Sequence, residues 1–140
     1  MAGQALVTWK EGIHFEGTAG GHTVQMDGRP DAGGQGLGFS PMQLLLVSLG
    51  GCTGMDVISI LKKMRQDVTS FSIEVSGVRA AEHPKTYTDI EVVYRVRGRN
   101  LSRQSVEQAV CLSQEKYCSV EAMLNKAARL TSRIEIEEET

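Results

Sequence analysis

The stretch SPMQLLLVSLGGCTGMDVISILKKM, residues 40–64, decides how the rest of the chain has to fold. Ser40 can cap the free N–H groups of a helix, and Pro41 suits the first helical position. We therefore predict a long helix from Pro41 to about Gln66. The first half of this helix is apolar nearly all round, which predicts that other elements enclose it.

Two glycines and a cysteine lie at the centre of this helix. Gly50 and Gly51 each weaken a helix by roughly 1 kcal/mol, so the pair indicates the close approach of another backbone, from a second helix or a partner subunit. Cys52 follows them directly. We consider two roles for this cysteine: a nucleophile beside an apolar pocket, or a small core residue. The neighbours of the cysteine at helical spacing change from an apolar to a more polar set: Leu45, Ser48 and Leu49 on one side, and Met55, Asp56 and Ser59 on the other.

The composition is that of an ordinary globular domain. The chain has 140 residues, of which 41% are hydrophobic and 23% charged, and we predict a single domain over residues 1–140. The formal net charge of -2 includes no basic surplus. We therefore expect neither nucleic acid nor an anionic membrane as a partner.

The first residues predict where the protein is located. MAGQALVTWKEG lacks the basic region and apolar run of a signal peptide, so a reducing cytoplasm is expected. There, the three cysteines are expected to be free, catalytic or metal-bound rather than part of a disulfide framework. The apolar segment Leu44–Leu61 has the length of a membrane span, but its glycines, its hydroxyls and Asp56 favour a buried core helix.

Alternation and turn signals predict strands on both sides of the long helix. Before it, three short strands are expected in ALVTW, GIHFEG and HTVQMDG, followed by a glycine-rich loop that matches no nucleotide- or phosphate-binding fingerprint. After it, the alternating segments 71–79 and 89–98 predict an antiparallel pair, and RIEIEEE near the C-terminus predicts a final strand.

Two further helices are predicted between these strands. Ser119 is expected to cap the second of them, VEAMLNKAAR, which places Cys118 at or just before a helix N-terminus, where the dipole favours a thiolate. Together the elements predict an α+β fold in which antiparallel strands pack on helices. The first helix begins at about Ser102 and carries a predicted buried stripe of Val106, Ala109, Val110, Ser113 and Tyr117.

Four motifs, taken in order, resemble the OsmC/Ohr family of thiol-dependent hydroperoxide reductases. They are the S-P-x-x-L helix start in SPMQLLL, the cysteine in GGCTGMDV, the E-H-P-K segment in RAAEHPKTYT, and the distant cysteine in SQEKYCSVEAML. Each cysteine alone is a weak signal, but the ordered set is specific. The resemblance runs from about Val24 to the C-terminus, and GGCTGMDVISILKKMR is most similar to the less characterised branch of that family.

This resemblance implies a fold, a mechanism and partners. The implied fold is an antiparallel sheet wrapped around a long central helix, in an intertwined homodimer whose active site lies at the subunit interface. Cys52 would be the peroxidatic thiol that attacks an organic hydroperoxide, and Cys118 the resolving thiol that closes a disulfide with it. An external dithiol, for which the family suggests lipoyl groups, would reduce that disulfide. The resemblance implies no metal and no organic cofactor.

Two positions depart from the characterised peroxidases of that family. Met42 replaces their glutamate after the helix-start proline, and their thiolate-supporting arginine has no counterpart in GTAGGHTVQ, where His22 is the nearest cationic candidate. Arg29, Arg79 and Arg95 are the alternative activating cations. Without the usual pair, we expect peroxidase activity that is weak near neutral pH and rises toward about pH 9.

The remaining reactive side chains have simpler interpretations. Cys111 lies beside the apolar stripe of the helix that begins at about Ser102 and is predicted to be structural. Glu82 and the histidine after it could form an acid/base pair, but they more simply shape a connector, because Pro84 restricts the preceding residue to extended backbone. Asp56, one turn after Cys52, would oppose thiolate formation if it were ionised and close; otherwise it bonds a hydroxyl or caps a partner's helix.

Two functions from different classes therefore stay open. The first is a cytoplasmic, homodimeric thiol peroxidase for organic hydroperoxides, because apolar residues around Cys52 favour an alkyl or lipid-like substrate. The second is a binding protein of the same fold that holds a small apolar or thiol-containing ligand at the dimer interface. In that case Cys52 lines the pocket, for which Met55 is a further candidate.

Overall fold

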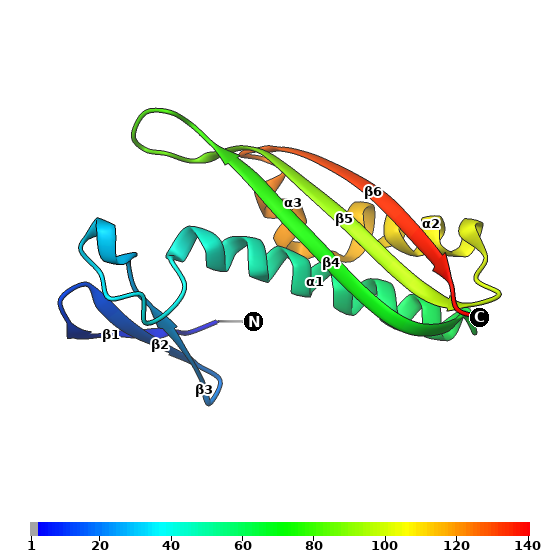
Figure 1. Ribbon diagram of the computed structural model, residues 1–140, viewed down its shortest axis with the longest axis horizontal. Helices are drawn as coiled ribbons and strands as arrows, with labels where there is room; N and C mark the ends of the chain where they lie inside the picture. The colour runs from blue at the N-terminus through cyan, green and yellow to red at the C-terminus, as the bar shows by residue number, and fades with distance from the viewer. Residues whose placement is uncertain (1–2) are drawn as a thin grey trace. The chain divides into compact units, whose positions relative to one another are not determined.

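The computed structural model describes residues 3–140 (Figure 1). The chain divides into two compact units, one up to Leu45 (unit 1) and one over Leu46–Thr140 (unit 2). The helix α1 (Pro41–Lys63) begins in unit 1 and continues through unit 2. Both candidate redox cysteines, Cys52 and Cys118, therefore belong to unit 2.

Unit 1 contains a three-stranded antiparallel sheet. Its strands β1 (Leu6–Glu11), β2 (His14–Ala19) and β3 (His22–Met26) pair in chain order. Glycines at positive φ at the turns allow the tight reversals, as at Gly12 between β1 and β2. These pairings confirm the three strands that the sequence predicts before the long helix.

A buried carboxylate organises the glycine-rich loop after β3, which includes the short 3-10 helix η1 (Pro30–Ala32). Asp27 is buried and accepts hydrogen bonds from the backbone N–H groups of Gly28, Gln35 and Leu37. Burial acts to raise the pKa of this carboxyl, but the three N–H donors outweigh burial and hold the pKa below its usual value. The carboxylate thus replaces the regular backbone pairing that a loop lacks.

The start of α1 follows the predicted local chemistry. The Ser40 hydroxyl accepts a hydrogen bond from Gln43 N–H at 3.2 Å, and the Gln43 side chain accepts one from Ser40 N–H at 3.0 Å. This reciprocal pair is a capping box. The helix ends at Lys63, slightly before the predicted Gln66, because Arg65 adopts a left-handed conformation with φ of 59°.

Unit 2 contains a mixed sheet of three strands in the order β4-β5-β6. β4 (Asp67–Arg79) and β5 (Tyr87–Arg99) form the predicted antiparallel pair and extend it at both ends. β6 (Arg129–Glu138) pairs parallel to β5, so the expectation of an antiparallel sheet is wrong for the last strand. Parallel pairing is possible because a helical crossover separates the two strands.

That crossover consists of three helical segments. They are α2 (Arg103–Leu112), the π-helical turn η2 (Ser113–Tyr117) and α3 (Ser119–Leu124). Figure 1 shows α1, α2 and α3 on one side of the sheet. The architecture confirms the α+β class.

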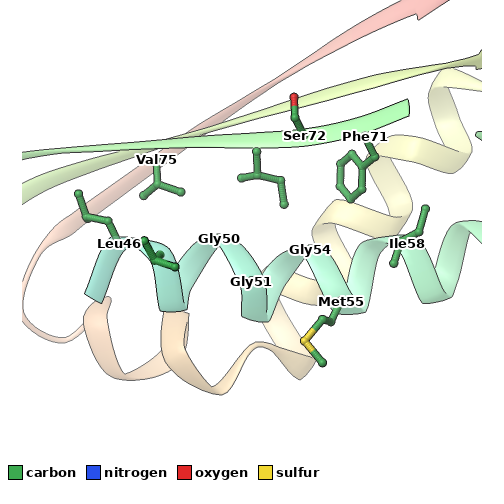
Figure 2. Close-up of a pocket in the computed structure, with 11 residues that line it drawn as sticks. Leu46, Gly50, Gly51, Gly54, Met55, Ile58, Phe71, Ser72 and Val75 are labelled. Carbon is green, nitrogen blue, oxygen red and sulfur yellow. The ribbon is translucent and has the colours of Figure 1, made fainter. Parts of the chain in front are cut away.

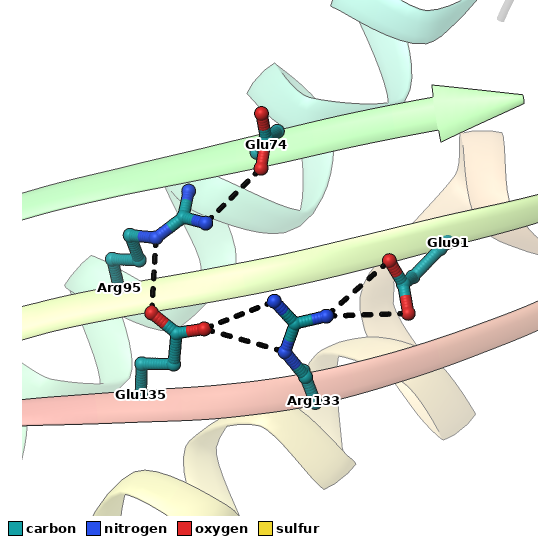
Figure 3. A network of polar contacts seen from close by, with 5 residues as sticks. All are labelled: Glu74, Glu91, Arg95, Arg133 and Glu135. Atoms are coloured by element: carbon teal, nitrogen blue, oxygen red, sulfur yellow. Dashed lines mark hydrogen bonds and ion pairs between the residues drawn. The ribbon is translucent and has the colours of Figure 1, made fainter.

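The two faces of the sheet in unit 2 differ in chemistry. The face toward the helices is apolar, as the alternation in β5 predicts, and its members are buried: Ile90, Val92, Tyr94 and Val96. The opposite face carries a chain of ion pairs across the three strands: Glu74, Arg95, Glu135, Arg133 and Glu91 (Figure 3). Because these pairs are exposed, each contributes at most about 1 kcal/mol, and they mainly keep this face polar.

The described chain does not enclose α1 as predicted. Leu49, Val57 and Leu61 are fully buried, but Val47 is 52% and Met55 73% exposed. By length and apolar composition alone α1 could cross a membrane. Its buried side chains and its polar contacts with other elements of unit 2 identify it instead as a core helix with one face left open.

Candidate active site

Unit 2 brings the two predicted redox cysteines together. Cys52 lies in the middle of α1 and is partly exposed, whereas Cys118 follows η2 and is 3% exposed. The Cys52 side chain is close enough to Cys118 to contribute to the raised pKa of that thiol. Both cysteines are free thiols in this structure.

The backbone around Cys118 is set by two hydrogen bonds. Its N–H donates to the carbonyl of Ser113 at 2.8 Å, a bond that closes the π-helical turn. Its sulfur accepts the backbone N–H of Glu121 at 3.4 Å and so caps α3. The predicted cap, Ser119, is wrong by one residue: the cysteine itself is the N-cap, and Ser119 is the first residue of the helix.

Burial decides the protonation of Cys118. Desolvation, with a smaller effect from the Cys52 thiol, raises the pKa of Cys118 to about 12. The bond from Glu121 N–H acts in the opposite direction but is outweighed. The helix N-terminus therefore acts on the pKa of Cys118 in the expected direction, but burial outweighs it and Cys118 is held as a thiol.

A chain of buried hydroxyls joins α1, β5 and η2 next to the two cysteines. The Thr53 hydroxyl lies 2.8 Å from that of Tyr94 and 2.7 Å from that of Ser113. The Ser113 hydroxyl donates to Oδ2 of Asp56 at 3.0 Å. Asp56 thus bonds a hydroxyl, one of the alternatives that the sequence left open. All three hydroxyl residues are fully buried.

Two further polar side chains, Gln114 and Glu121, lie near the hydroxyl groups and Cys118. Gln114 donates to Ser132 of β6 at 2.8 Å and reaches the Tyr94 hydroxyl at 3.5 Å. Burial raises the pKa of Tyr94, so the phenol stays protonated at neutral pH. Glu121 is 6% exposed, and burial raises the pKa of its carboxyl as well.

Sequence reasoning missed most of this polar network. The one available signal was Ser113, a hydroxyl residue on an otherwise apolar helical stripe. Thr53 follows Cys52 directly but carries no motif of its own. Tyr94 was assigned to the inward face of a strand, and its hydroxyl partners could not be read from alternation.

The other cysteine and one stripe residue lie away from this site. Cys111 is exposed and donates to Glu115 at 3.3 Å; this hydrogen bond, with smaller effects of desolvation and of the Glu115 charge, raises the pKa of that thiol. Tyr117 is 51% exposed, so its predicted place on the buried stripe is wrong. The π-helical turn holds an extra residue and rotates Tyr117 off the stripe.

The alternative cations of unit 2 are engaged elsewhere. Arg79 donates its Nε to the carbonyl of Lys85 at 2.7 Å in the β4–β5 connector, where Glu82 is also exposed. Arg95 bridges Glu74 and Glu135 on the polar face of the sheet (Figure 3). Neither arginine is directed at Cys52, so their roles as activators gain no support.

The remaining candidates belong to unit 1. His22 is exposed at the start of β3, and Arg29 is exposed and pairs with Asp31 at 3.3 Å. Met42 is partly buried in the first turn of α1. Their roles toward the thiol pair stay predictions.

An apolar groove of about 590 Å³ runs between α1 and β4 (Figure 2). Gly50 and Gly54 form its floor, and Figure 2 shows Val75 and Phe71 of β4 pointing toward α1. A side chain on Gly54 would place its Cβ 2.9 Å from Cδ1 of Ile73, so glycine permits this close packing. Gly51, by contrast, faces open space. Among residues 3–140, side chains of β4 approach Gly50 and Gly54, so the predicted approach of another backbone at Gly50 and Gly51 is wrong for the single chain. Met55 also lines the groove.

A family model described as OsmC-like protein matches residues 33–133. The chain belongs to the OsmC-like family. This OsmC-like chain is 43% identical to protein YhfA of Escherichia coli K12 over 134 residues, which cover 95% of the chain and 97% of YhfA.

Solved structures agree with this assignment. A hypothetical protein from Aquifex aeolicus VF5 is 35% identical to the OsmC-like chain, covers 100% of it over 99% of its own length, and superimposes with a TM-score of 0.89. An organic hydroperoxide resistance protein OsmC from Legionella pneumophila is 16% identical, covers 96% of the chain over 97% of its own length, and superimposes with a TM-score of 0.69. This second likeness shows the shared fold.

Proposed function

We propose that this OsmC-like protein is a thiol-dependent reductase of organic hydroperoxides. The observation that supports the proposal most directly is that unit 2 brings Cys52 of α1 close to Cys118, which burial keeps as a thiol. A thiol next to a second cysteine that becomes a sulfenic acid can close a disulfide with it. The hydroperoxide resistance proteins that share this fold give the proposal its reaction class.

The reaction divides into two balanced steps. The Cys52 thiolate attacks the O–O bond of ROOH and becomes a sulfenic acid, while the leaving alkoxide takes a proton and departs as ROH. Cys118 then attacks the sulfenic sulfur, and its thiol proton leaves with the hydroxyl group as water. A disulfide between Cys52 and Cys118 results, and a dithiol, for which we propose a lipoyl group, reduces it by thiol exchange.

The elevated pKa of Cys118 fits a resolving role in this sequence. Burial is the main cause of the elevation. Before Cys52 is oxidised, Cys118 therefore stays a thiol and does not compete for the peroxide.

The setting of the reaction follows the sequence expectations. We propose that the protein works in the cytoplasm as a homodimer, with both units of each chain forming one OsmC-like domain. Because Met42 replaces the usual glutamate and the usual arginine has no counterpart, activity is expected to be weak near neutral pH and to rise toward about pH 9. The Met42→Glu change alone should not restore activity, because a lone carboxylate near the thiol opposes its ionisation.

Oxidation of the purified protein tests this proposal. One equivalent of cumene hydroperoxide should consume the Cys52 thiol and yield a Cys52–Cys118 disulfide by peptide mapping, and dihydrolipoamide should then support turnover. The Cys111→Ser variant is the matched control and should behave like the wild type. A Cys52 thiol that survives excess hydroperoxide, or a dominant bridge to Cys111, would contradict the assignment.

The apolar groove favours a second candidate, a binding protein without redox turnover. Its volume of about 590 Å³ fits a small apolar molecule, and its lining residues are almost all apolar. Calorimetry with a series of alkyl ligands separates the two functions. Saturable binding without loss of the Cys52 thiol would favour the binding protein.

A further inference from the structure

We propose that Asp56 and Ser113 are positioning residues that clamp the π-helical turn η2 to α1 and so hold the Cys118 thiol against Cys52 for disulfide closure. The inference rests on the proposed function, because disulfide closure is its second step. It gives a function to the buried hydrogen-bond network of Asp56, Ser113, Thr53 and Tyr94, which the chemistry of the two cysteines alone does not explain.

The hydroxyl groups of the clamp all donate in the direction of the Asp56 carboxylate. The Asp56 carboxylate accepts from the Ser113 hydroxyl at 3.0 Å, so the single hydrogen of that hydroxyl is used. Ser113 Oγ then has to accept from Thr53 at 2.7 Å, and Thr53 in turn accepts from Tyr94 at 2.8 Å. Each hydroxyl thus donates toward the carboxylate. A polarised buried chain of this kind favours one arrangement of the three elements that it joins.

Ser113 links this chain directly to the resolving cysteine. Its side chain bonds to α1, and its backbone carbonyl accepts the N–H of Cys118 at 2.8 Å. On the other side, Asp56 and Cys52 are one turn apart on the same helix. Ser113 therefore connects the surroundings of the two cysteines by two hydrogen bonds. Its hydroxyl bonds to Asp56, and its carbonyl bonds to the N–H of Cys118.

The π-helical geometry of η2 explains why the position of Cys118 depends on the clamp. A π turn accommodates one residue more than an α turn, and such turns persist where the surroundings hold them. If η2 relaxed to α-helical geometry, the next residue would rotate by about 100° around the helix axis. Cys118 is that residue. Without the clamp, its sulfur would turn away from Cys52.

Separation of the sulfurs has a defined chemical consequence. Closure joins the sulfenic sulfur of Cys52 to the sulfur of Cys118 and releases water, which requires contact between the two atoms. A sulfenic acid that waits for its partner stays open to a second hydroperoxide and is oxidised to sulfinic acid. The clamp should thus speed closure and protect Cys52 from over-oxidation, with no effect on the first attack.

The test compares variants by two measurements on the full chain. The first is the equilibrium of the Cys52–Cys118 disulfide with dithiothreitol. The second is the rate of disulfide closure after one equivalent of cumene hydroperoxide, with the sulfenic acid trapped by dimedone. Ser113→Ala should shift the equilibrium toward the dithiol and slow closure, each by about tenfold or more, while the Cys52 thiol is consumed at the wild-type rate.

Two further variants serve as controls. Ser113→Thr keeps the hydroxyl and should restore wild-type values. Val96→Ala removes a buried β5 side chain outside the clamp and should lower the melting temperature without changing either measurement. Should Ser113→Ala fail to fold, Asp56→Asn takes its place and should shift the equilibrium in the same direction by a smaller factor.

The outcomes separate the clamp from the proposed function. If the wild-type Cys52 ignores hydroperoxide, the proposed function fails, yet the dithiothreitol equilibrium still tests the clamp on a disulfide made with diamide. Wild-type values for Ser113→Ala in both measurements overturn the clamp. So does an equal change in Val96→Ala, because the effect would then reflect general stability.

Discussion

Glu121 is a buried acidic residue next to Cys118. Its backbone N–H donates to the Cys118 sulfur, and its side chain is enclosed, with Oε2 lacking a hydrogen-bond partner among residues 3–140. Burial raises the pKa of the carboxyl, so it is easier to protonate in the folded chain than in the unfolded one.

The sign of the resulting pH dependence follows from this shift. Below the unfolded value of about 4.5, both states bind the proton and Glu121 has no effect on stability. As pH rises above it, the unfolded chain releases the proton first, so the free energy of unfolding falls until the folded carboxyl also ionises. We expect Glu121→Gln to remove this fall and to be more stable than the wild type at neutral pH.

Urea denaturation between pH 4 and pH 8, as approximate limits, measures this effect. Glu137→Gln is the matched control, because the Glu137 side chain is 72% exposed on the polar face of the sheet. The control should follow the wild-type curve. A parallel curve for Glu121→Gln would mean that Glu121 is solvated or paired in the folded protein.

At the scale of elements, the packing of α1 on β4 depends on a glycine inside a helix. Alanine at position 54 would gain about 1 kcal/mol of helix propensity. Its Cβ, however, would lie 2.9 Å from Cδ1 of Ile73. Overpacking of this kind typically costs about 1–3 kcal/mol, so Gly54→Ala should be net destabilising.

A double-mutant cycle isolates that contact. Ile73→Val removes the methyl group that the new Cβ meets, so Gly54→Ala should become neutral or stabilising in the Ile73→Val background. Chemical denaturation of the four proteins gives a coupling of about 1 kcal/mol or more if the contact is as described. Additive effects would show that the helix and the strand can separate at little cost.

Local chemistry explains which elements could be predicted. The reciprocal bonds of Ser40 and Gln43 need no tertiary context, so the start of α1 follows from the sequence alone. The inward face of β5 follows from strict alternation. The direction of β6 does not, because alternation is the same in a parallel and an antiparallel strand, and only the crossover decides between them.

The site was predicted in part for similar reasons. The pairing of Cys52 and Cys118 came from a resemblance in motif order, and the structure brings these residues together. The hydrogen bonds of Ser113 to α1 and to Cys118 could not be predicted, because a π-helical turn has no sequence signature. The high pKa of Cys118 was missed because position at a helix end is visible in a sequence, whereas depth of burial is not.

At the scale of the whole molecule, the exposed apolar face of α1 predicts that a partner subunit covers it. Val47, Gly51 and Met55 form an exposed sector along the helix, and all three also line the apolar groove between α1 and β4. Complete burial of a valine or methionine side chain contributes about 1.5–3 kcal/mol. In a twofold dimer each contact occurs twice, so this sector could support a strong association.

We therefore expect the protein to be a dimer whose subunits do not fold alone, with a melting temperature that rises with concentration. Met55→Lys should weaken the dimer by about 100-fold in Kd, because two methionines would lose about 1.5 kcal/mol each. Met123→Lys is the matched control, since Met55 and Met123 are both 73% exposed in the single chain. If only Met55 lies in the interface, the control should associate like the wild type in sedimentation velocity. A stable folded monomer of the wild type at nanomolar concentration would refute the dimer, and equal weakening by both variants would show that charge, rather than the α1 face, governs association.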